Sequence, residues 1–283
     1  MLDYIKTFPS AKINLFLKVL NKRNDGYHNI QSLLVKTDLS DVLEVEISNS
    51  FQIEIYGEFS NCVNVDDNIF IPIFSFFKKN FNLDRQLKIK LQKNIPVGAG
   101  LGGGSADGAE FIKAINKIFN LNLNKKELQK ISLQFGSDLP FFFEEKPAII
   151  SMKGEEITVY NKNFNLDILI IKPSINLATK KVFENFQNNF SSLISSEKIL
   201  SKSIIDISKE IDNDLTNSAI AIVPEISQIL NELKYFKCLV AKMSGSGSSC
   251  FAIFDNLSQI DECENFFKQK YQNYFIKKTK IHN

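Results

Sequence analysis

Hydrophobic and polar residues alternate along the first sixty positions of the chain, which is the pattern of half-buried strands. Residues 11–20, AKINLFLKVL, carry an aliphatic side chain at every second position from Ile13 to Val19. A polar turn around Asp25-Gly26 follows and is typical of a hairpin. Similar alternation predicts further strands at about residues 30–37, 42–47 and 51–56. We therefore expect an antiparallel, strand-rich beginning.

The spacing of apolar residues changes to that of helices in the second quarter of the chain. Residues 66–81 open with a capping Asp-Asp-Asn and predict a helix, and residues 85–96 predict an alternating strand. Two more amphipathic helices are expected, one after about Ser105 and one over residues 124–135. The segment GSDLPFFF, residues 136–143, then breaks the helical pattern.

Strands and helices are mixed again in the second half of the chain. The expected elements are strands within 148–160 and at 166–171, a long helical stretch at about 178–233, a strand–loop–strand unit at 237–254 and a helix at 260–270. A polar, turn-rich stretch near 155–165 marks a boundary, and 283 residues suffice for two domains. The pattern predicts an α/β (α+β) fold with domains at 1–158 and 159–283.

Composition and charge exclude several classes of protein. The net charge of +2 comes without a concentrated basic stripe, so no nucleic-acid partner is expected, and the C-terminal KKTK is expected to be a solvated tail. Four scattered cysteines and two histidines form no zinc pattern and fit reduced thiols, with Cys250 as a small buried residue. Lysines interrupt the apolar N-terminus, so we expect no signal peptide, no membrane span and a cytoplasmic protein.

Five of the twelve glycines lie between positions 98 and 104, within NIPVGAGLGGGSADGAEF, residues 94–111. A glycine inside a helix or strand costs about 1 kcal/mol relative to alanine, so this density needs a reason. Gly98, Gly100 and Gly103 satisfy the dinucleotide pattern G-x-G-x-x-G, but no strand with an acidic end follows about 20 residues later. A Walker-type loop also fails, because Gly104 occupies the position of its lysine.

A simpler anion site fits this glycine segment. A helix that begins at about Ser105 presents free backbone N–H groups and the positive end of its dipole, about half an elementary charge, without a lysine. The plainer alternative is a tight turn packed against a sheet. The glycine density, together with a serine at the helix start, favours phosphate binding.

The glycine segment, AKIN near the start and SGSG near the end together resemble the GHMP small-molecule kinases. The resemblance implies an N-terminal ATP-binding domain and a ferredoxin-like C-terminal domain, with the active site in the cleft between them. It also implies that SGSG brings Gly245, Ser246 and Gly247 to the substrate. The implied ATP phosphate loop consists of Pro96, Val97, Gly98, Ala99, Gly100, Leu101, Gly102, Gly103, Gly104, Ser105 and Ala106.

Within this family, the motifs resemble those of one branch in particular. SAKINLFLKV, RNDGYHNIQSL, the triple glycine before Ser105 and GSDLPFFF follow the motifs of one branch in order. That branch uses ATP to phosphorylate the 2-hydroxyl of 4-(cytidine 5'-diphospho)-2-C-methyl-D-erythritol, in the non-mevalonate route to isoprenoids. The resemblance implies this small-molecule substrate, Mg²⁺ on the ATP phosphates within reach of Ser105, and adenine contacts at Asn68 and Lys93. We expect a monomer or a homodimer.

Two charged residues form the predicted catalytic pair. Lys12 lies inside an apolar strand, where an ammonium is costly unless it is paired, and it shares one strand face with Asn14. Asp138 lies in a non-periodic break, where a carboxylate can accept the proton of a substrate hydroxyl. The plainer alternatives are a lysine that faces water and an aspartate that caps a helix. The resemblance favours the catalytic roles, with Asn14 orienting the substrate.

The resemblance also implies a cytosine site. It makes Tyr27 a stacking platform for the base and His28 a reader of the base edge, whereas His28 by itself is typical of a turn residue. Phe183 matches the second face of the cytosine sandwich, and Thr179 matches a nearby polar contact.

Two other functions stay open at this point. A GHMP kinase for another small alcohol would leave Tyr27 and His28 without a pyrimidine to hold. A catalytically inactive nucleotide-binding or sensor protein on the same fold would not need both Lys12 and Asp138.

Overall fold

The computed structural model describes residues 2–282, and these form two compact units. The first unit contains Met1–Ala11, Leu39–Val97 and Gly102–Glu145, and the second contains Lys12–Asp38, Gly98–Leu101 and Lys146–Asn283. Each unit is thus assembled from segments that are distant in the sequence. This division differs from the predicted boundary between residues 158 and 159, because four strands that end before residue 160 pair within the sheet of the second unit.

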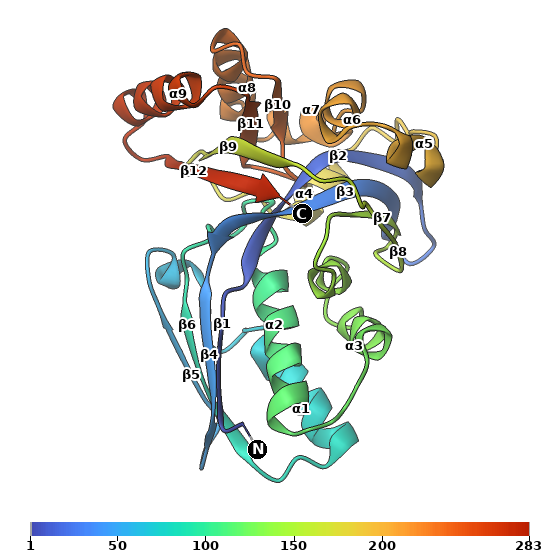
Figure 1. The fold of residues 1–283 in the computed structure, drawn as a ribbon, viewed down its shortest axis with the longest axis vertical. Helices are drawn as coiled ribbons and strands as arrows, with labels where there is room; N and C mark the ends of the chain where they lie inside the picture. The colour runs from blue at the N-terminus through green and yellow to red at the C-terminus, as the bar shows by residue number, and fades with distance from the viewer. Residues whose placement is uncertain (1, 283) are drawn as a thin grey trace. The chain divides into compact units, whose positions relative to one another are not determined.

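A four-stranded sheet with the order β1-β4-β6-β5 forms the first unit. The strands are β1 (Tyr4–Thr7), β4 (Val42–Ser48), β5 (Gln52–Tyr56) and β6 (Gln86–Gln92). The helices are α1 (Phe70–Phe81), α2 (Gly103–Ile118), α3 (Lys125–Ser132) and the short 3₁₀ helices η1 (Ser60–Cys62) and η2 (Leu139–Phe143). Figure 1 shows α1 and α2 on one face of this sheet. Every second side chain of β6 is buried, as its alternating sequence predicts.

An eight-stranded sheet with the order β10-β11-β9-β12-β3-β7-β8, and with β2 paired to β3, forms the second unit. The strands are β2 (Ser10–Lys22), β3 (His28–Ser40), β7 (Ala148–Met152), β8 (Glu156–Val159), β9 (Asn165–Lys172), β10 (Val240–Met243), β11 (Cys250–Phe254) and β12 (Phe275–His282). The helices are α4 (Thr179–Glu184), α5 (Ser196–Ser201), α6 (Ile204–Glu210), α7 (Thr216–Ile220), α8 (Glu225–Tyr235) and α9 (Leu257–Lys270). The succession β9-α8-β10-β11-α9-β12, with antiparallel pairing, is ferredoxin-like.

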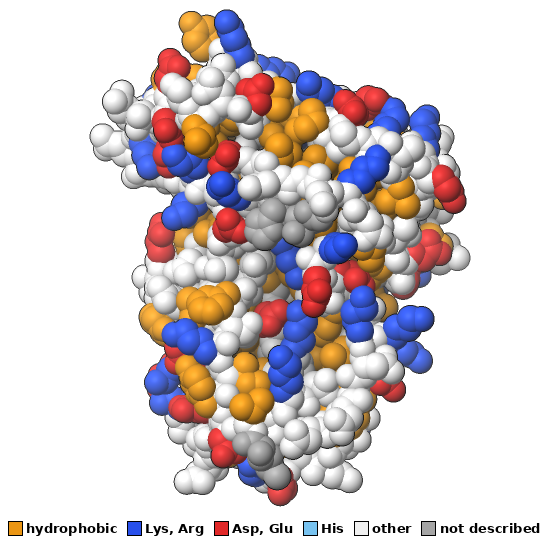
Figure 2. Space-filling model, viewed as in Figure 1, with side chains coloured by type: hydrophobic (Ala, Val, Ile, Leu, Met, Phe, Trp, Pro, Cys, Tyr) orange, Lys and Arg blue, Asp and Glu red, His pale blue; other side chains and the backbone are white. Residues whose placement is uncertain are grey.

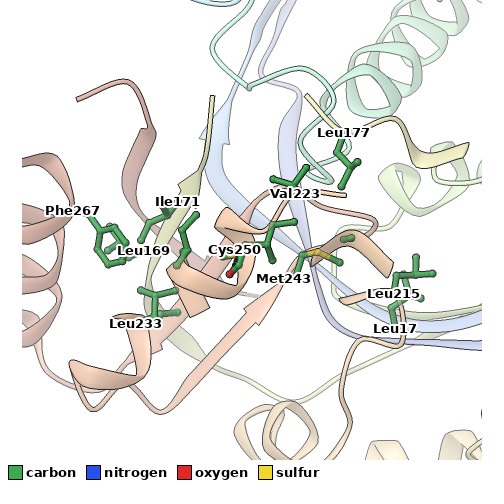
Figure 3. Packing of buried hydrophobic residues seen from close by; sticks show 14 of the residues in the cluster. Leu17, Leu169, Ile171, Leu177, Leu215, Val223, Leu233, Met243, Cys250 and Phe267 are labelled. Atoms are coloured by element: carbon green, nitrogen blue, oxygen red, sulfur yellow. Dashed lines mark hydrogen bonds between the residues drawn. The ribbon is translucent and has the colours of Figure 1, made fainter. Parts of the chain in front are cut away.

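The second unit has a hydrophobic core that joins its sheet to α8 and α9 (Figure 3). Leu169 of β9, Leu233 of α8 and Phe267 of α9 belong to this core, which extends to Leu17 of β2. The core therefore supports the strand that carries Lys12. Cys250 is fully buried in it, which confirms the prediction of a small buried residue. Burial raises the pKa of its thiol, so the sulfur stays protonated at neutral pH.

The long helical stretch expected at 178–233 is divided into five helices, α4 to α8. The side chains of Ser195 and Ser203 accept hydrogen bonds from backbone N–H groups at the starts of α5 and α6, and Pro224 lies directly before α8. Serine at an N-cap and proline near a helix start both define new helix beginnings. The apolar spacing predicted helical structure in this stretch correctly, and Ser195, Ser203 and Pro224 mark where α5, α6 and α8 start.

The prediction that KKTK is a solvated tail is wrong. Residues 277–280 lie in β12, which pairs along its length with β9 and meets β3 through Ile281. The lysines of this segment are exposed, while Thr279 and Ile281 are buried. The pairing partners in β9 lie more than 100 positions earlier in the chain. Local composition cannot reveal a strand that is defined by so distant a partner.

The charge on the surface and the length of the helices concern the predictions about nucleic-acid and membrane partners. On the face in view in Figure 2, lysine and arginine side chains lie among aspartate and glutamate side chains. Among residues 2–282, no helix combines the length and the apolar character needed to cross a membrane.

The position of β12 inside the sheet gives a stability prediction. Ile281→Ala should lower the free energy of unfolding by about 2–5 kcal/mol, because it removes a fully buried side chain. Lys277→Ala, at an exposed position of the same strand, should change it by less than about 0.5 kcal/mol. Urea denaturation of both variants measures this difference. Equal effects of the two substitutions would contradict the central position of β12.

Candidate active site

Lys12 and Asn14 lie on the same face of β2, as the alternation predicts. The Nζ of Lys12 donates a hydrogen bond of 2.6 Å to Oδ1 of Asn14, and each side chain is only 3% exposed. Asn14 also donates from Nδ2 to the hydroxyl of Ser32 on β3, at 2.8 Å. The alternative of a lysine that faces water is therefore excluded. A buried, hydrogen-bonded ammonium keeps a fixed position, which suits a group that must meet a developing negative charge.

The strand β2 is joined to both glycine-containing loops within the second unit. The backbone N–H of Lys12 donates to the carbonyl of Leu101 at 2.8 Å, and the N–H of Asn14 donates to the hydroxyl of Ser244 at 3.2 Å. That hydroxyl donates in turn to the carbonyl of Gly100 at 3.0 Å. Lys12 is therefore fixed by the first half of the glycine loop on one side and by SGSG on the other.

Gly100 is a glycine because the protein itself occupies the space of a side chain. Its φ is +74°, and a Cβ built on it would lie 2.2 Å from the carbonyl oxygen of Ser244. Gly245 is similarly close to the predicted catalytic residues, since its Cβ would lie 3.3 Å from Nζ of Lys12 and 3.2 Å from Oδ1 of Asn14. At these two positions the plainer interpretation, close packing of the backbone, is sufficient.

Asn213 supports the SGSG loop, although no pattern in the sequence indicates this role. Its Nδ2 donates to the carbonyls of Met243 at 2.9 Å and Gly245 at 2.8 Å, and its Oδ1 accepts from the N–H of Leu215. The side chain is buried, so these bonds replace lost water contacts. An asparagine in a polar stretch gives no signal in a single sequence that it bonds to a loop some thirty residues away.

The second half of the glycine loop begins helix α2 in the first unit. The helix starts at Gly103, two residues before the expected position, and the first helical bond runs from the N–H of Ala106 to the carbonyl of Gly102. The N–H groups of residues 103–105 are therefore the orphan donors of the first turn. A Cβ built on Gly104 would meet nothing within 4 Å, and Ser105 is half-buried. This is the geometry of an anion site.

Asp138 lies directly before η2 in the first unit, at a half-buried position. It occupies the N-cap position, but its side chain makes no capping hydrogen bond to that helix. The alternative of an ordinary helix cap therefore does not account for this aspartate. Asp138 belongs to the first unit and Lys12 to the second, so their pairing stays a prediction.

The predicted cytosine residues all belong to the second unit. The ring of His28 stacks on Phe183, with centroids 5.0 Å apart and an interplanar angle of 20°. Tyr27 is 54% exposed, and Nζ of Lys153 lies 3.3 Å from the centroid of its ring. The hydroxyls of Thr179 and Ser246 are 2.9 Å apart, which links α4 to the SGSG loop. An exposed tyrosine can offer an aromatic surface to a base, and Tyr27 directly precedes the stacked His28 in the sequence.

The charge state of His28 suits the recognition of a neutral base. Burial, with a smaller contribution from the nearby charge of Lys22, lowers the pKa of His28 below its ordinary value. The imidazole is therefore neutral at pH 7, with one nitrogen that donates and one that accepts.

Lys93 and Asn68, the predicted adenine residues, both take part in the structure of the first unit. Nζ of Lys93 donates to carboxylate oxygens of Asp41 and Asp107, and Oδ1 of Asn68 accepts from the N–H of Phe70 at the start of α1. Burial by itself lowers the pKa of Lys93, and the two carboxylates more than offset this, so the lysine stays charged. Burial raises the pKa of Asp107 to about 7 despite the lysine.

Metal ligands were predicted at Ser105 alone. Within the described part of the chain, no three histidine, cysteine, aspartate or glutamate side chains gather in a way that could hold a metal ion. A hydroxyl at a phosphate-binding helix start is a common partner of a nucleotide-bound Mg²⁺.

Two family models match this chain. The model described as GHMP kinases N terminal domain matches residues 68–145, and the model described as GHMP kinases C terminal matches residues 195–273. Together they cover more than half of the 283 residues. With its glycine loop, SGSG loop and ferredoxin-like unit, the chain belongs to the GHMP kinase family.

Curated relatives across nearly the whole chain share one name, 4-diphosphocytidyl-2-C-methyl-D-erythritol kinase. The relative from Thermoanaerobacter pseudethanolicus is 35% identical and the alignment covers 97% of this chain and 96% of that protein. The relative from Clostridium beijerinckii is 32% identical, with 95% and 98% covered. These similarities confirm the resemblance to that branch of the family.

Solved structures share the fold. A structure of 4-(cytidine 5'-diphospho)-2C-methyl-D-erythritol kinase matches with a TM-score of 0.79 and 22% identity, covering 99% of this chain and 100% of that one. Mevalonate kinase from L. major, in complex with R-mevalonate, matches with a TM-score of 0.74 and 15% identity, covering 98% and 95%.

The surroundings of the glycines give a matched pair of substitutions. Gly104→Ala should leave stability unchanged or raise it by about 0.4–1 kcal/mol, because the added methyl meets no protein atom and the residue is helical. It should nevertheless weaken ATP binding roughly tenfold or more, because the methyl enters the space above the free N–H groups. Calorimetric titration and thermal unfolding measure the two effects.

Gly100→Ala is the contrasting variant. It should destabilise the protein by at least about 1–2 kcal/mol from the left-handed backbone alone, with the clash against Ser244 in addition. If Gly104→Ala bound ATP with unchanged affinity, the assignment of the phosphate site to the start of α2 would be wrong.

Proposed function

We propose that this protein transfers the γ-phosphate of ATP to the 2-hydroxyl of 4-(cytidine 5'-diphospho)-2-C-methyl-D-erythritol. The proposal takes the substrate from the name shared by relatives that are 31–35% identical. The observation in this chain that carries it is the stack of His28 on Phe183, with Tyr27 next to His28 in the sequence. A kinase for a small alcohol without a base would not need this aromatic group.

The donor side of the reaction is assigned to the loop from Pro96 to Ala106. The orphan N–H groups at residues 103–105 are donors for phosphate oxygens, and the open space at Gly104 leaves room for them. Ser105 is the proposed contact for Mg²⁺ or a phosphate, and a bound Mg²⁺ would neutralise charge on the transferring group. Asn68 and the chain near Lys93 are the proposed neighbours of the adenine.

The chemical step needs one base and one cation from the protein. Asp138 is the proposed base: its carboxylate accepts the proton of the 2-hydroxyl as that oxygen forms its bond to the γ-phosphorus. The bond from the γ-phosphorus to the bridging oxygen breaks, and ADP leaves. Lys12, fixed by Asn14, stabilises the negative charge that builds on the attacking oxygen. Asn14 is the proposed orienting residue for the acceptor.

The cytidine end is assigned to the aromatic group of the second unit. Tyr27 offers a face for stacking, and the neutral His28 can both donate to and accept from a pyrimidine edge. Thr179 and Ser246, which contact each other, are proposed polar contacts. Gly245 and Gly247 are proposed to contact the substrate through backbone atoms, since protein atoms already fill the space of a side chain at both glycines.

The cellular setting follows from this function and from the cysteines. All four are free thiols, two of them buried, which fits a reducing compartment, and we propose cytoplasmic residence. A monomer or a homodimer remains the proposed assembly. There are two alternatives, a GHMP kinase for another alcohol and an inactive nucleotide-binding protein. A turnover assay distinguishes each of them from the proposed function.

A substrate panel tests the proposed acceptor. Release of ADP should be fast with the cytidyl substrate and at background with mevalonate, homoserine and galactose. Turnover of one of the other three alcohols, with none of the cytidyl compound, would support the first alternative. Nucleotide binding without any turnover would support the second.

Asp138→Asn tests the base. The amide keeps the shape of the side chain but cannot take a proton, so kcat should fall by about 100- to 10,000-fold while the Kd for ATP stays the same. Steady-state turnover and calorimetric titration measure these two quantities. A kcat close to that of the unsubstituted protein would exclude Asp138 as the base.

Tyr27→Ala tests the cytosine platform. Loss of one stacking face should raise KM for the cytidyl substrate by about 5- to 150-fold and leave KM for ATP unchanged. Tyr235→Ala, at an exposed tyrosine of α8, is the matched control and should change neither constant. An equal rise of both constants in Tyr27→Ala would place this residue outside the cytosine site.

A further inference from the structure

Three charged side chains are buried together beneath the glycine loop in the first unit. Asp41 precedes β4, Lys93 follows β6, and Asp107 lies in the second turn of α2. Each is 3% exposed or less. Nζ of Lys93 donates to Oδ2 of Asp107 at 2.7 Å and to Oδ2 of Asp41. These three residues are called the charged clamp below.

The charged clamp holds the chain where it enters the glycine loop. The second oxygen of Asp41, Oδ1, accepts hydrogen bonds from the backbone N–H groups of Asn94 at 2.6 Å and Ile95 at 2.8 Å. One carboxylate therefore binds two successive amides and the lysine that precedes them. Charge-assisted bonds of this kind are short and directional, so they fix the position of the backbone.

The same clamp holds the chain where it leaves the loop. Asp107 is part of α2, and its bond to Lys93 connects this helix to the residues before the loop. Lys93 also lies directly under the first residue of the helix, since a Cβ on Gly103 would be 3.0 Å from its Nζ. The two ends of the loop are thus tied to one ammonium.

Stability alone is a weak reason for burying this group. Burial of ions often costs more than their attraction returns, and here two carboxyl groups share one ammonium. In addition, Oδ1 of Asp107 has no hydrogen-bond partner within the described chain. An apolar trio would fill the same space without these costs, so the geometry that the clamp imposes is what distinguishes it.

We propose that Asp41, Lys93 and Asp107 are positioning residues for the phosphate donor, which hold both ends of the glycine loop so that the N–H groups of residues 103–105 keep one direction. The inference rests on the proposed function only in taking ATP as the ligand of this loop. It assigns the ammonium of Lys93 to holding the loop, and the backbone near Lys93 stays the proposed neighbour of the adenine.

Asp107→Ala tests the clamp. It should raise the Kd for ATP at least tenfold and leave the Kd for the cytidyl substrate within twofold, because only the donor loop loses its anchor. Asp107→Asn keeps an oxygen that accepts from Lys93 and should restore ATP binding to within threefold. Lys117→Ala, at an exposed position of the same helix, is the matched control and should change neither constant. Calorimetric titration with each ligand measures all of these values.

Two results would overturn the proposal. One is an unchanged Kd for ATP in Asp107→Ala, and the other is an equal weakening of both ligands, which would indicate general damage. If Asp107→Ala does not fold, Asp41→Asn takes its place, since it keeps the side-chain shape while weakening the bonds to two amides and to Lys93, and the same two results decide. If the unsubstituted protein binds ATP but not the cytidyl compound, the proposed function fails, while the ATP constants still decide the clamp.

Discussion

The carbonyl of Ser244 lies where any side chain at position 100 would have to go, and the position of Lys12 depends on this contact. A Cβ on Gly100 would come within 2.2 Å of that oxygen, so the two loops can meet here only if position 100 carries no side chain. Their meeting brings the hydroxyl of Ser244 to the N–H of Asn14, and Asn14 holds the ammonium of Lys12. The position of the predicted catalytic lysine is therefore a consequence of glycine at one distant residue.

Glycine is needed in this loop for two different reasons, and the sequence alone does not distinguish them. Gly100 makes room for the protein, whereas the space at Gly104 contains no protein atom within 4 Å. Phosphate binding needs both kinds of glycine. Gly100 lets the loop pack closely against the protein, and Gly104 leaves room for the phosphates. The charged clamp then limits how the helix start can turn, which is the preorganisation that phosphoryl transfer requires.

Local patterns predicted what local geometry determines. Alternation placed Lys12 and Asn14 on one face, glycine density marked the start of α2, and the usual behaviour of cysteine as a small buried residue predicted Cys250. Contacts between residues that are far apart in the chain could not be predicted from the sequence. Asn213 bonds to a loop some thirty residues away, KKTK becomes a strand through β9, and the second unit includes residues 12–38 and 98–101 from well before the expected boundary. In a single sequence, nothing marks such partners.

The position of the new phosphate tests the central claim most directly. In 2-C-methyl-D-erythritol the second carbon carries a methyl group and no hydrogen, so a phosphate on its oxygen has no three-bond coupling to a carbinol proton. Proton-coupled ³¹P NMR of the product formed from ATP and the cytidyl substrate should therefore give a new monoester singlet. A monoester signal split by carbinol protons, or no new signal, would contradict transfer to the 2-hydroxyl.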